Sequence, residues 1–315
     1  MLVKKYDSSA QVEWDEFVRN ARNSTFLFMR SYMDYHADRF TDHSLLFYSE
    51  NGRLIAILPA TQHKDGTIKS HGGLTYGGFL LAPKTSAIDV VEAFKLCIDY
   101  YKNKGYKKLI YKPIPFIYHT SPSQDDIYAL HTQKAEKIQC GLSSSIDLLK
   151  PKAFSKSKKQ GVKNAKKNGV EVLEAGLSSL DDFVRVLNYR LEEKHGAQAT
   201  HTLDELILLM ERHPKNIKLY VAMLNDEMVA GVLMFYTNSC AHVQYIATTE
   251  RGRNIGALDY VIATVMSSIE GSLRWFDFGV STEGENCKVN GGLLAQKEMF
   301  GARSVVYETY EINLT

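Results

Sequence analysis

The second half of this chain repeats the order of elements that hydrophobic patterning predicts for the first half. The first half indicates helices near 12–21 and 30–40, a hairpin turning at Asn51-Gly52, a helix near 86–103 and a strand near 107–114. The second half indicates helices near 180–194 and 203–212, a hairpin turning at Asn225-Asp226, a strand at 241–248, a helix near 257–269 and a strand near 274–279. A duplicated unit is expected from such a repeat, although generic alternation of strands and helices would look similar. We predict an α/β fold with a mixed sheet.

A lysine-rich segment separates the two halves. No acidic residue occurs between 148 and 170, and the lysines there are Lys150, Lys152, Lys156, Lys158, Lys159, Lys163, Lys166 and Lys167. If residues 154–168 form a helix, five of these lysines share one face, and their electric fields add. Such a stripe would attract a phosphate-rich ligand, for example coenzyme A, a nucleotide sugar or the acceptor arm of a tRNA. A solvated linker helix explains the same lysines without a ligand.

A glycine-containing turn at 251–257 is predicted between a strand and a long helix. Unpaired amides at a helix N-terminus, together with the guanidinium groups of Arg251 and Arg253, suit an anion such as a phosphate. Asn254 can adopt a left-handed conformation better than most other non-glycine residues. An ordinary surface turn would explain the same residues. The predicted anion-binding residues are Arg251, Gly252, Arg253, Asn254, Gly256 and Ala257.

Two residues on neighbouring predicted strands are candidates for proton transfer. Asp277 lies among the aromatic residues Trp275, Phe276 and Phe278, where a raised carboxyl pKa would favour base chemistry. A cap of the following loop is the alternative role for Asp277. His242 is a second candidate base, or a structural histidine. Alternation along the strand places His242 and Gln244 on the same side of the sheet.

Further polar residues surround these two candidates in the sequence. Ser281 and Glu283 follow Asp277 within a polar loop. Asn290 and Lys297 lie about two helical turns apart and are expected on one helix face. Lys297 would neutralise a phosphate or a carboxylate of the acceptor, or form a salt bridge with a nearby acid. Tyr245 lies on the same predicted strand as His242 and is either a site residue or part of the core.

Four segments together resemble the FemAB-like branch of the GNAT superfamily of acyl-CoA N-acyltransferases, which includes BioF2-like acetyltransferase domains. These segments are Lys159 to Val170 with Ala165 and Gly169-Val170, the turn at 251–257, Phe276-Asp277-Phe278-Gly279, and Asn290 to Gly301 with Lys297 and Phe300. Asn254 departs from the family pattern, which has a glycine there. The resemblance implies two GNAT-like units: 1–149 on the acceptor side, a basic linker helix at 150–169, and 170–315 on the donor side.

The resemblance also implies an activity and a distribution of roles. The expected reaction transfers an acyl group from acetyl-CoA or another acyl-CoA to an amino group of an amino sugar or a cell-envelope precursor. Aminoacyl-tRNA-dependent peptidyl transfer, with tRNA carrying the donor, and non-catalytic ligand binding are the alternatives. The turn at 251–257 would bind the cofactor. The expected catalytic residues are Asp277, His242, Ser281 and Glu283, and the expected substrate-binding residues are Gln244, Tyr245, Asn290 and Lys297.

Composition and charge exclude several classes of protein. The formal net charge is +2 over 315 residues, so the average surface is not that of a DNA-binding protein. The four cysteines are far apart and include no Cys-x-x-Cys pair, so we predict no structural metal. The chain has no apolar run long enough for a signal peptide or a membrane span, and we therefore expect a cytoplasmic protein.

Overall fold

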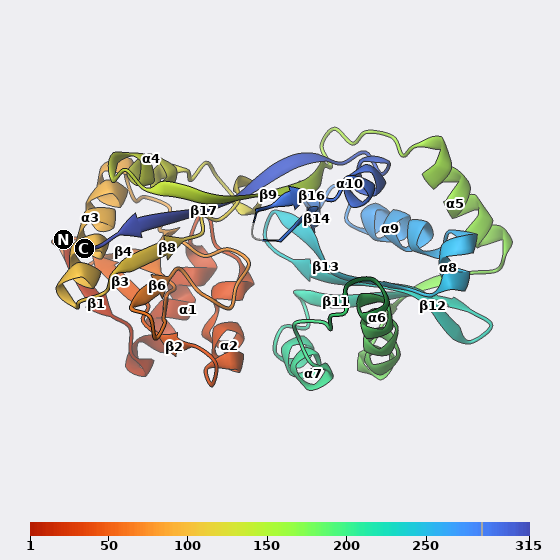
Figure 1. Cartoon of the computed structure of the whole chain (residues 1–315), viewed down its shortest axis with the longest axis horizontal. Helices are drawn as coiled ribbons and strands as arrows, with labels where there is room; N and C mark the ends of the chain where they lie inside the picture. The colour runs from red at the N-terminus through yellow and green to blue at the C-terminus, as the bar shows by residue number, and fades with distance from the viewer. Residues whose placement is uncertain (285) are drawn as a thin grey trace. The chain divides into compact units, whose positions relative to one another are not determined.

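The computed structural model describes residues 1–284 and 286–315, and the chain forms two compact units. Unit 1 contains residues 1–142, 282–288 and 306–315; unit 2 contains residues 143–281 and 289–305. Two long strands, β9 (Glu136–Asp147) and β17 (Arg303–Asn313), contribute residues to both units (Figure 1). This division differs from the sequence-based one at the C-terminus. The last residues return to unit 1 because β17 pairs with β8 (Lys108–Tyr111) of that unit.

Unit 1 is built on two groups of paired strands. The first has the order β1-β3-β4-β7, and the second has the order β17-β8-β6-β5-β2. The predicted hairpin is present, with β3 and β4 paired antiparallel and Gly52 in the turn at a φ of +78°. The remaining bounds are β1 (Leu2–Lys5), β2 (Thr41–Asp42), β3 (Leu45–Tyr48), β4 (Leu54–Leu58), β5 (Thr61–Gln62), β6 (Thr67–Lys69), β7 (Leu80–Leu81), α1 (Gln11–Asn20), α2 (Arg30–Met33), α3 (Ala87–Asn103) and α4 (Asp125–Thr132).

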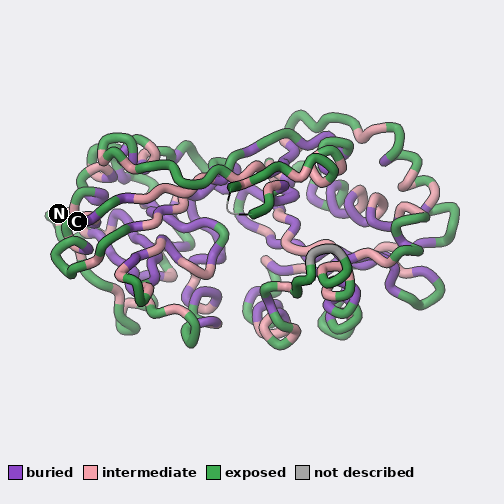
Figure 2. The backbone as a smooth tube through the Cα atoms, viewed as in Figure 1, coloured by how far each residue is buried: buried purple, intermediate pink, exposed green. Residues whose placement is uncertain are grey.

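Unit 2 is a six-stranded region of mixed sheet with the order β10-β11-β12-β13-β14-β9. Its strands are β10 (Glu171–Ala175), β11 (Ile217–Leu224), β12 (Glu227–Tyr236), β13 (Cys240–Thr248) and β14 (Trp275–Val280). Its helices are α5 (Lys156–Lys167), α6 (Leu180–His195), α7 (Leu203–Arg212), α8 (Glu250–Ile255), α9 (Ala257–Ser268) and α10 (Gly291–Glu298). Helix α9 covers one face of β11 and β12, while α6 and α7 lie on the other side (Figure 1). Strands β11 and β12 are buried along most of their length (Figure 2).

Strands β13 and β14 diverge after a short parallel pairing. Their register runs from Cys240 opposite Trp275 to His242 opposite Asp277 and ends there, although both strands continue. On its other edge, β13 carries a β-bulge: Leu233 of β12 pairs with Tyr245 and Met234 with Val243, so that Gln244 is the extra residue. The bulge interrupts the alternation on which the sequence-based pairing of His242 with Gln244 rested. The resulting split in the sheet positions the candidate site.

The lysine-rich segment forms helix α5, which packs on α8 and α9 of unit 2. Lys158 points inward, and its Nζ lies 2.7 Å from Asp259 Oδ1. Gly161 and Gly256 make a close backbone contact, since a Cβ added to Gly256 would lie 2.5 Å from the Gly161 carbonyl oxygen. Helix α5 is therefore part of the packed unit.

No helix within residues 1–284 and 286–315 is both long and apolar enough to cross a bilayer.

Candidate active site

Asp277 and His242 meet at the point where β13 and β14 diverge. His242 Nδ1 and Asp277 Oδ2 are 2.7 Å apart. On the other carboxylate oxygen, Asp277 Oδ1 accepts hydrogen bonds from Ser143 Oγ at 2.8 Å and Ser145 Oγ at 2.6 Å, both from β9. Asp277 is fully buried, whereas His242 retains partial exposure. The arrangement is a buried carboxylate that orients a histidine ring.

The pKa of Asp277 is lowered, which corrects the raised value expected from its aromatic neighbours. Burial acts to raise it, but the hydrogen bond and charge of His242 and the hydrogen bonds of the two serines together lower the pKa to about 2. Asp277 is therefore an ionised hydrogen-bond acceptor at neutral pH, and His242 must donate through Nδ1. In a neutral ring the lone pair then lies on Nε2, so His242 is better suited than Asp277 to accept a proton.

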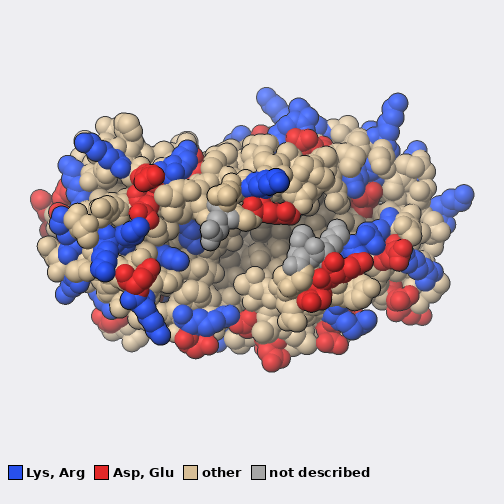
Figure 3. All heavy atoms as spheres, in the orientation of Figure 1, with Lys and Arg blue, Asp and Glu red and all other residues tan. Residues whose placement is uncertain are grey.

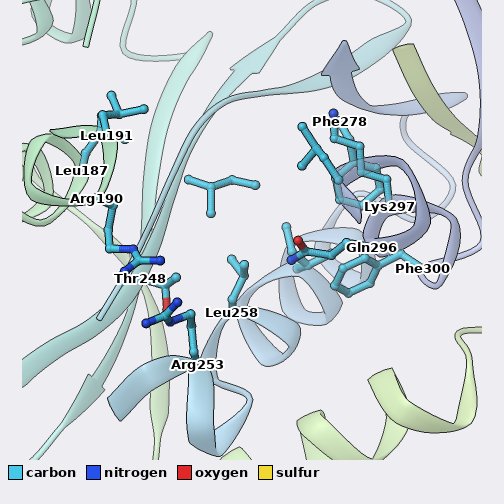
Figure 4. Close-up of a pocket in the computed structure, with 13 residues that line it drawn as sticks. Leu187, Arg190, Leu191, Thr248, Arg253, Leu258, Phe278, Gln296, Lys297 and Phe300 are labelled. Atoms are coloured by element: carbon cyan, nitrogen blue, oxygen red, sulfur yellow. The ribbon is translucent and has the colours of Figure 1, made fainter. Parts of the chain in front are cut away.

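A pocket of about 240 Å³ occupies the split beyond this pair (Figure 4). Arg190 of α6 and Arg253 of α8 lie near Thr248 on one side of the view, and Gln296 and Lys297 of α10 lie on the other. The walls between them are apolar: Leu187, Leu191, Ile246, Leu258, Ile262, Phe278, Leu293 and Phe300. The pocket is thus a short apolar passage with cationic groups at its two ends.

Lys297 connects the pocket to the Asp277–His242 pair. Its Nζ donates to the carbonyl oxygens of Gly279 and Val280, each at 2.8 Å, and the side chain is buried. Gly279, at a φ of +75°, packs against the ring of His242, with an added Cβ 3.3 Å from Cε1. Burial lowers the pKa of Lys297 to about 8, and the charge of Asp277 opposes that shift. Among the described residues these carbonyls are the hydrogen-bond partners of Lys297, and the salt bridge with a nearby acid, one of its two expected roles, is not formed.

Most of the predicted phosphate turn is a capped helix, in which the amides of Gly252, Arg253 and Gly256 have hydrogen-bond partners. Gly252 N donates to Thr249 Oγ1, Arg253 N to the Thr249 carbonyl, and Gly256 N to the Arg253 carbonyl. Asn254 is helical, and the left-handed residue is Gly256. The amides of 252 and 253 are therefore engaged by Thr249, which caps α8, and the amide of 256 is engaged by the C-terminal end of the same helix. Gly252 is buried against β12, and an added Cβ would lie 2.0 Å from the Val229 carbonyl oxygen.

The two arginines of this segment have different surroundings. Arg253 lines the pocket, whereas Arg251 lies 3.6 Å from Glu227 and is not among the lining residues. Ala257 is buried in the core of unit 2, beneath the contact of Gly256 with α5.

The other predicted site residues are distributed more widely. Tyr245 shares a 2.6 Å hydrogen bond with His201 Nδ1, and Gln244 is the bulge residue. Asn290 is the N-cap of α10, since its side chain accepts from Leu293 N at 3.0 Å. Ser281 is fully buried, and its Oγ has no hydrogen-bond partner among the described residues. Glu283 is exposed and belongs to unit 1, so it is not grouped with Asp277.

Three residues of the candidate site were not predicted from the sequence, namely Ser143, Ser145 and Arg190. Ser143 and Ser145 lie two residues apart on β9, and this spacing places both hydroxyl groups on the same side of the sheet. The spacing was visible in the sequence. Nothing local marks Arg190, because its role depends on α6 lying beside the split. Within the described residues, no cluster of three or more His, Cys, Asp or Glu side chains is arranged to hold a metal ion.

Residues 152–286 match the family model of the acetyltransferase (GNAT) domain. This segment contains α5, the strands from β10 to β14 and the Asp277–His242 pair. Comparison with curated protein sequences finds no match.

Known structures resemble the whole chain. A crystal structure of FemX has a TM-score of 0.72 at 12% identity, covering 99% of this chain and 97% of that one. The C-terminal domain of a putative lysylphosphatidylglycerol synthetase from Agrobacterium fabrum has a TM-score of 0.63 at 12% identity, covering 98% and 92%. A tandem GNAT protein from the clavulanic acid biosynthesis pathway has a TM-score of 0.54 at 10% identity, covering 100% and 98%. At these identities the likeness concerns the fold, and it confirms the predicted α/β architecture of two GNAT-like units.

Proposed function

We propose that this chain, whose residues 152–286 match the GNAT acetyltransferase domain and whose fold resembles those of FemX and a tandem GNAT protein, transfers an acyl group from acyl-CoA to an amino group. The acceptor in this proposal is an amino sugar or a cell-envelope precursor, and the reaction takes place in the cytoplasm. The pocket in the β13–β14 split is the observation that carries the donor assignment, because its apolar walls and its two arginines suit a thioester whose carrier bears phosphate groups.

The two ends of the pocket fit different parts of such a donor. Arg190 and Arg253 come from different helices and lie at the same end. Guanidinium groups bind phosphate oxygens through paired hydrogen bonds, so this end suits the phosphate groups of coenzyme A. The apolar walls then enclose the uncharged chain that leads to the thioester. Edges of diverging strands carry backbone amides that suit the developing oxyanion.

Proton transfer is assigned to His242. Attack by an amine requires that the ammonium proton leave, and a side chain with an available lone pair serves this step. In the proposal, His242 accepts the proton through Nε2 while Asp277 fixes the ring and stabilises the imidazolium that forms. Lys297 holds the carbonyls of Gly279 and Val280 and so keeps the backbone beside the His242 ring in place. Asp277 and Lys297 act here as positioning residues.

Acetyl-CoA binding measured by calorimetry tests the donor assignment. We expect saturable binding to the unmodified protein and binding at least roughly tenfold weaker in Arg253→Ala, since charged hydrogen bonds contribute about 1.5–3 kcal/mol. Arg251→Ala is the matched control, because it removes the same charge from the same helix outside the pocket. Equal weakening in the two variants would contradict a specific role for the pocket, and absence of binding would contradict the acyl-CoA donor.

Aminoacyl-tRNA is the second candidate donor. The resemblance to a putative lysylphosphatidylglycerol synthetase favours it, because that name describes joining an aminoacyl group to an acceptor. Release of the amino acid from aminoacyl-tRNA by a protein that does not bind acetyl-CoA would select this donor. A non-catalytic binding role would instead give tight binding of a nucleotide-linked sugar with no acyl transfer from either donor.

A further inference from the structure

The outer face of α5 carries a stripe of exposed lysines, here called the lysine stripe. Its members are Lys156, Lys159, Lys163, Lys166 and Lys167. The opposite face of the helix holds the buried residues Lys158 and Ala165, which fix the orientation of α5 on unit 2. At about 1.5 Å per residue, the stripe is about 17 Å long. Lys and Arg side chains project from the surface over α5 (Figure 3).

The positive field of the lysine stripe is reinforced by its flanking sequence. Lys150 and Lys152 are exposed just before the helix, and the first acidic residues on either side along the chain are Asp147 and Glu171. The one buried lysine of the helix, Lys158, already has Asp259 as its partner. Like charges on adjacent turns of a helix repel each other, so the stripe is destabilising by itself. A polyanionic surface would relieve this repulsion.

The residue types within the stripe distinguish two kinds of polyanion. Nucleic-acid sites favour arginine for its planar fork and aromatic side chains for base stacking. The exposed positions of the helix itself have neither: those between its lysines are Ser157 and Gln160, with Asn168 following the helix. The neighbouring ring of Tyr260 is covered by Lys166, whose Nζ lies 5.1 Å from the ring centroid. Clusters of four to eight lysines or arginines on a helix are instead typical of binding to anionic lipid headgroups. Leu149, which is 69% exposed, adds an apolar side chain beside Lys150.

We propose that the lysine stripe of α5 docks this protein on an anionic lipid bilayer. The contact is peripheral and electrostatic, with the lysine ammonium groups lying among the phosphate-bearing headgroups. Each lysine near such a surface contributes about 1 kcal/mol, and this contribution falls as salt screens the field. The proposal goes beyond acyl transfer and does not depend on it, because docking requires no donor or acceptor in the pocket.

Co-sedimentation with lipid vesicles tests the proposal on the full chain. The probes are vesicles of phosphatidylcholine alone and vesicles with roughly 30% phosphatidylglycerol, at low and at physiological salt. We expect binding to the anionic vesicles only, weakened by salt. The triple variant Lys159→Gln, Lys163→Gln, Lys167→Gln should reduce the partition coefficient roughly 100-fold, as expected for three lysine contacts.

A second triple variant controls for net charge. Lys84→Gln, Lys95→Gln and Lys102→Gln remove three exposed lysines from unit 1 and change the net charge equally. We expect it to retain at least about a third of the affinity, because distant charges are screened at physiological salt. Circular dichroism of both variants establishes that each is folded. Equal losses in the two triple variants, binding to neutral vesicles, or binding of a tRNA mixture without any vesicle binding would each overturn the proposal.

Discussion

The Asp277 carboxylate is both buried and ionised, because hydrogen-bond donors surround it. Its carboxylate accepts from Ser143, Ser145 and His242, and these bonds outweigh the effect of burial on its pKa. The aromatic residues next to Asp277 in the sequence had suggested a raised pKa. That prediction was wrong because side chains alternate along a strand, so sequence neighbours face the opposite side of the sheet. Phe276 and Phe278 belong to the core that packs with α9, whereas Asp277 has the serines and His242 as its partners.

Asp277→Asn should reduce turnover with little effect on donor affinity. The asparagine is uncharged and offers an amide in place of one carboxylate oxygen, so the tautomer and orientation of His242 are no longer fixed. Loss of a general base lowers rates by roughly 10²- to 10⁴-fold. The measurements are kcat with an amine acceptor that the unmodified protein acylates, and acetyl-CoA affinity by calorimetry. Ser145→Ala is a milder comparison that removes one donor to Asp277; a variant Asp277→Asn with full kcat would remove this pair from the mechanism.

Because the pKa of Lys297 is lowered, we expect the free energy of unfolding to increase as the pH rises above about 8. Its pKa is lowered to about 8 from 10.5 by burial, so between these values the unfolded state binds more protons than the folded state. Stability then increases with pH across this window, by up to about 3 kcal/mol. Urea unfolding at pH 7.5, 9 and 10.5 measures the slope in the unmodified protein and in Lys297→Met. The pKa of Lys112 in unit 1 is also lowered and adds to the slope in both proteins. The contribution of Lys297 is therefore the difference between the pH slope of the unmodified protein and that of Lys297→Met. Identical slopes would contradict the lowered pKa.

At the scale of elements, local patterns located most helices and hairpins. Helix α7 begins and ends where the pattern predicted, because Thr202 and Glu205 form a capping box at its start. The predicted helix at 30–40 is shorter, consisting of α2 followed by a 3-10 turn at Asp34–His36. The turn at 251–257 is helical instead of open. The glycines of this segment favour a turn, whereas Thr249 favours a helix because its hydroxyl can cap one. The structure follows the cap.

Gly256→Ala should destabilise the protein more than an equivalent change elsewhere. Gly256 has a φ of +78° and contacts Gly161 of α5, whereas Gly271 has a φ of +75° with nothing near its added Cβ. Gly271→Ala thus isolates the conformational cost of about 1–2 kcal/mol. We expect Gly256→Ala to exceed that cost by about 1–3 kcal/mol because of overpacking. Urea unfolding of both variants gives the comparison; equal effects would mean that α5 moves aside without cost.

At the scale of the molecule, the chain crosses between its compact units several times. The C-terminal residues complete unit 1, where Ile312 and Leu314 are buried in its core. Sequence order alone assigned these residues to the second unit. The structure assigns them by strand pairing with β8, which joins residues far apart in the chain.

Ile312→Ala should destabilise unit 1 although it lies three residues from the C-terminus. Truncation of a buried isoleucine costs about 2–5 kcal/mol. Val306→Ala on the same strand is the matched control, because Val306 is 46% exposed and should cost less than about 1 kcal/mol. Thermal unfolding and hydrogen exchange at the amides of β8 measure the effect. Unchanged protection of β8 in Ile312→Ala would contradict the assignment of the C-terminus to unit 1.

Local patterns in the amino-acid sequence were enough to predict the periodic elements, the two hairpins with Asn-Gly and Asn-Asp turns, and the candidates Asp277 and His242. These follow from spacing and turn chemistry that act over a few residues. Only the folded chain brings distant residues together. Ser143 and Ser145 donate hydrogen bonds to Asp277, Arg190 and Arg253 line one pocket, and the C-terminal strand pairs with β8. The tertiary structure also decided the ionisation of Asp277, since a pKa depends on partners in space. Contacts across a sheet join distant residues, and no local pattern encodes them.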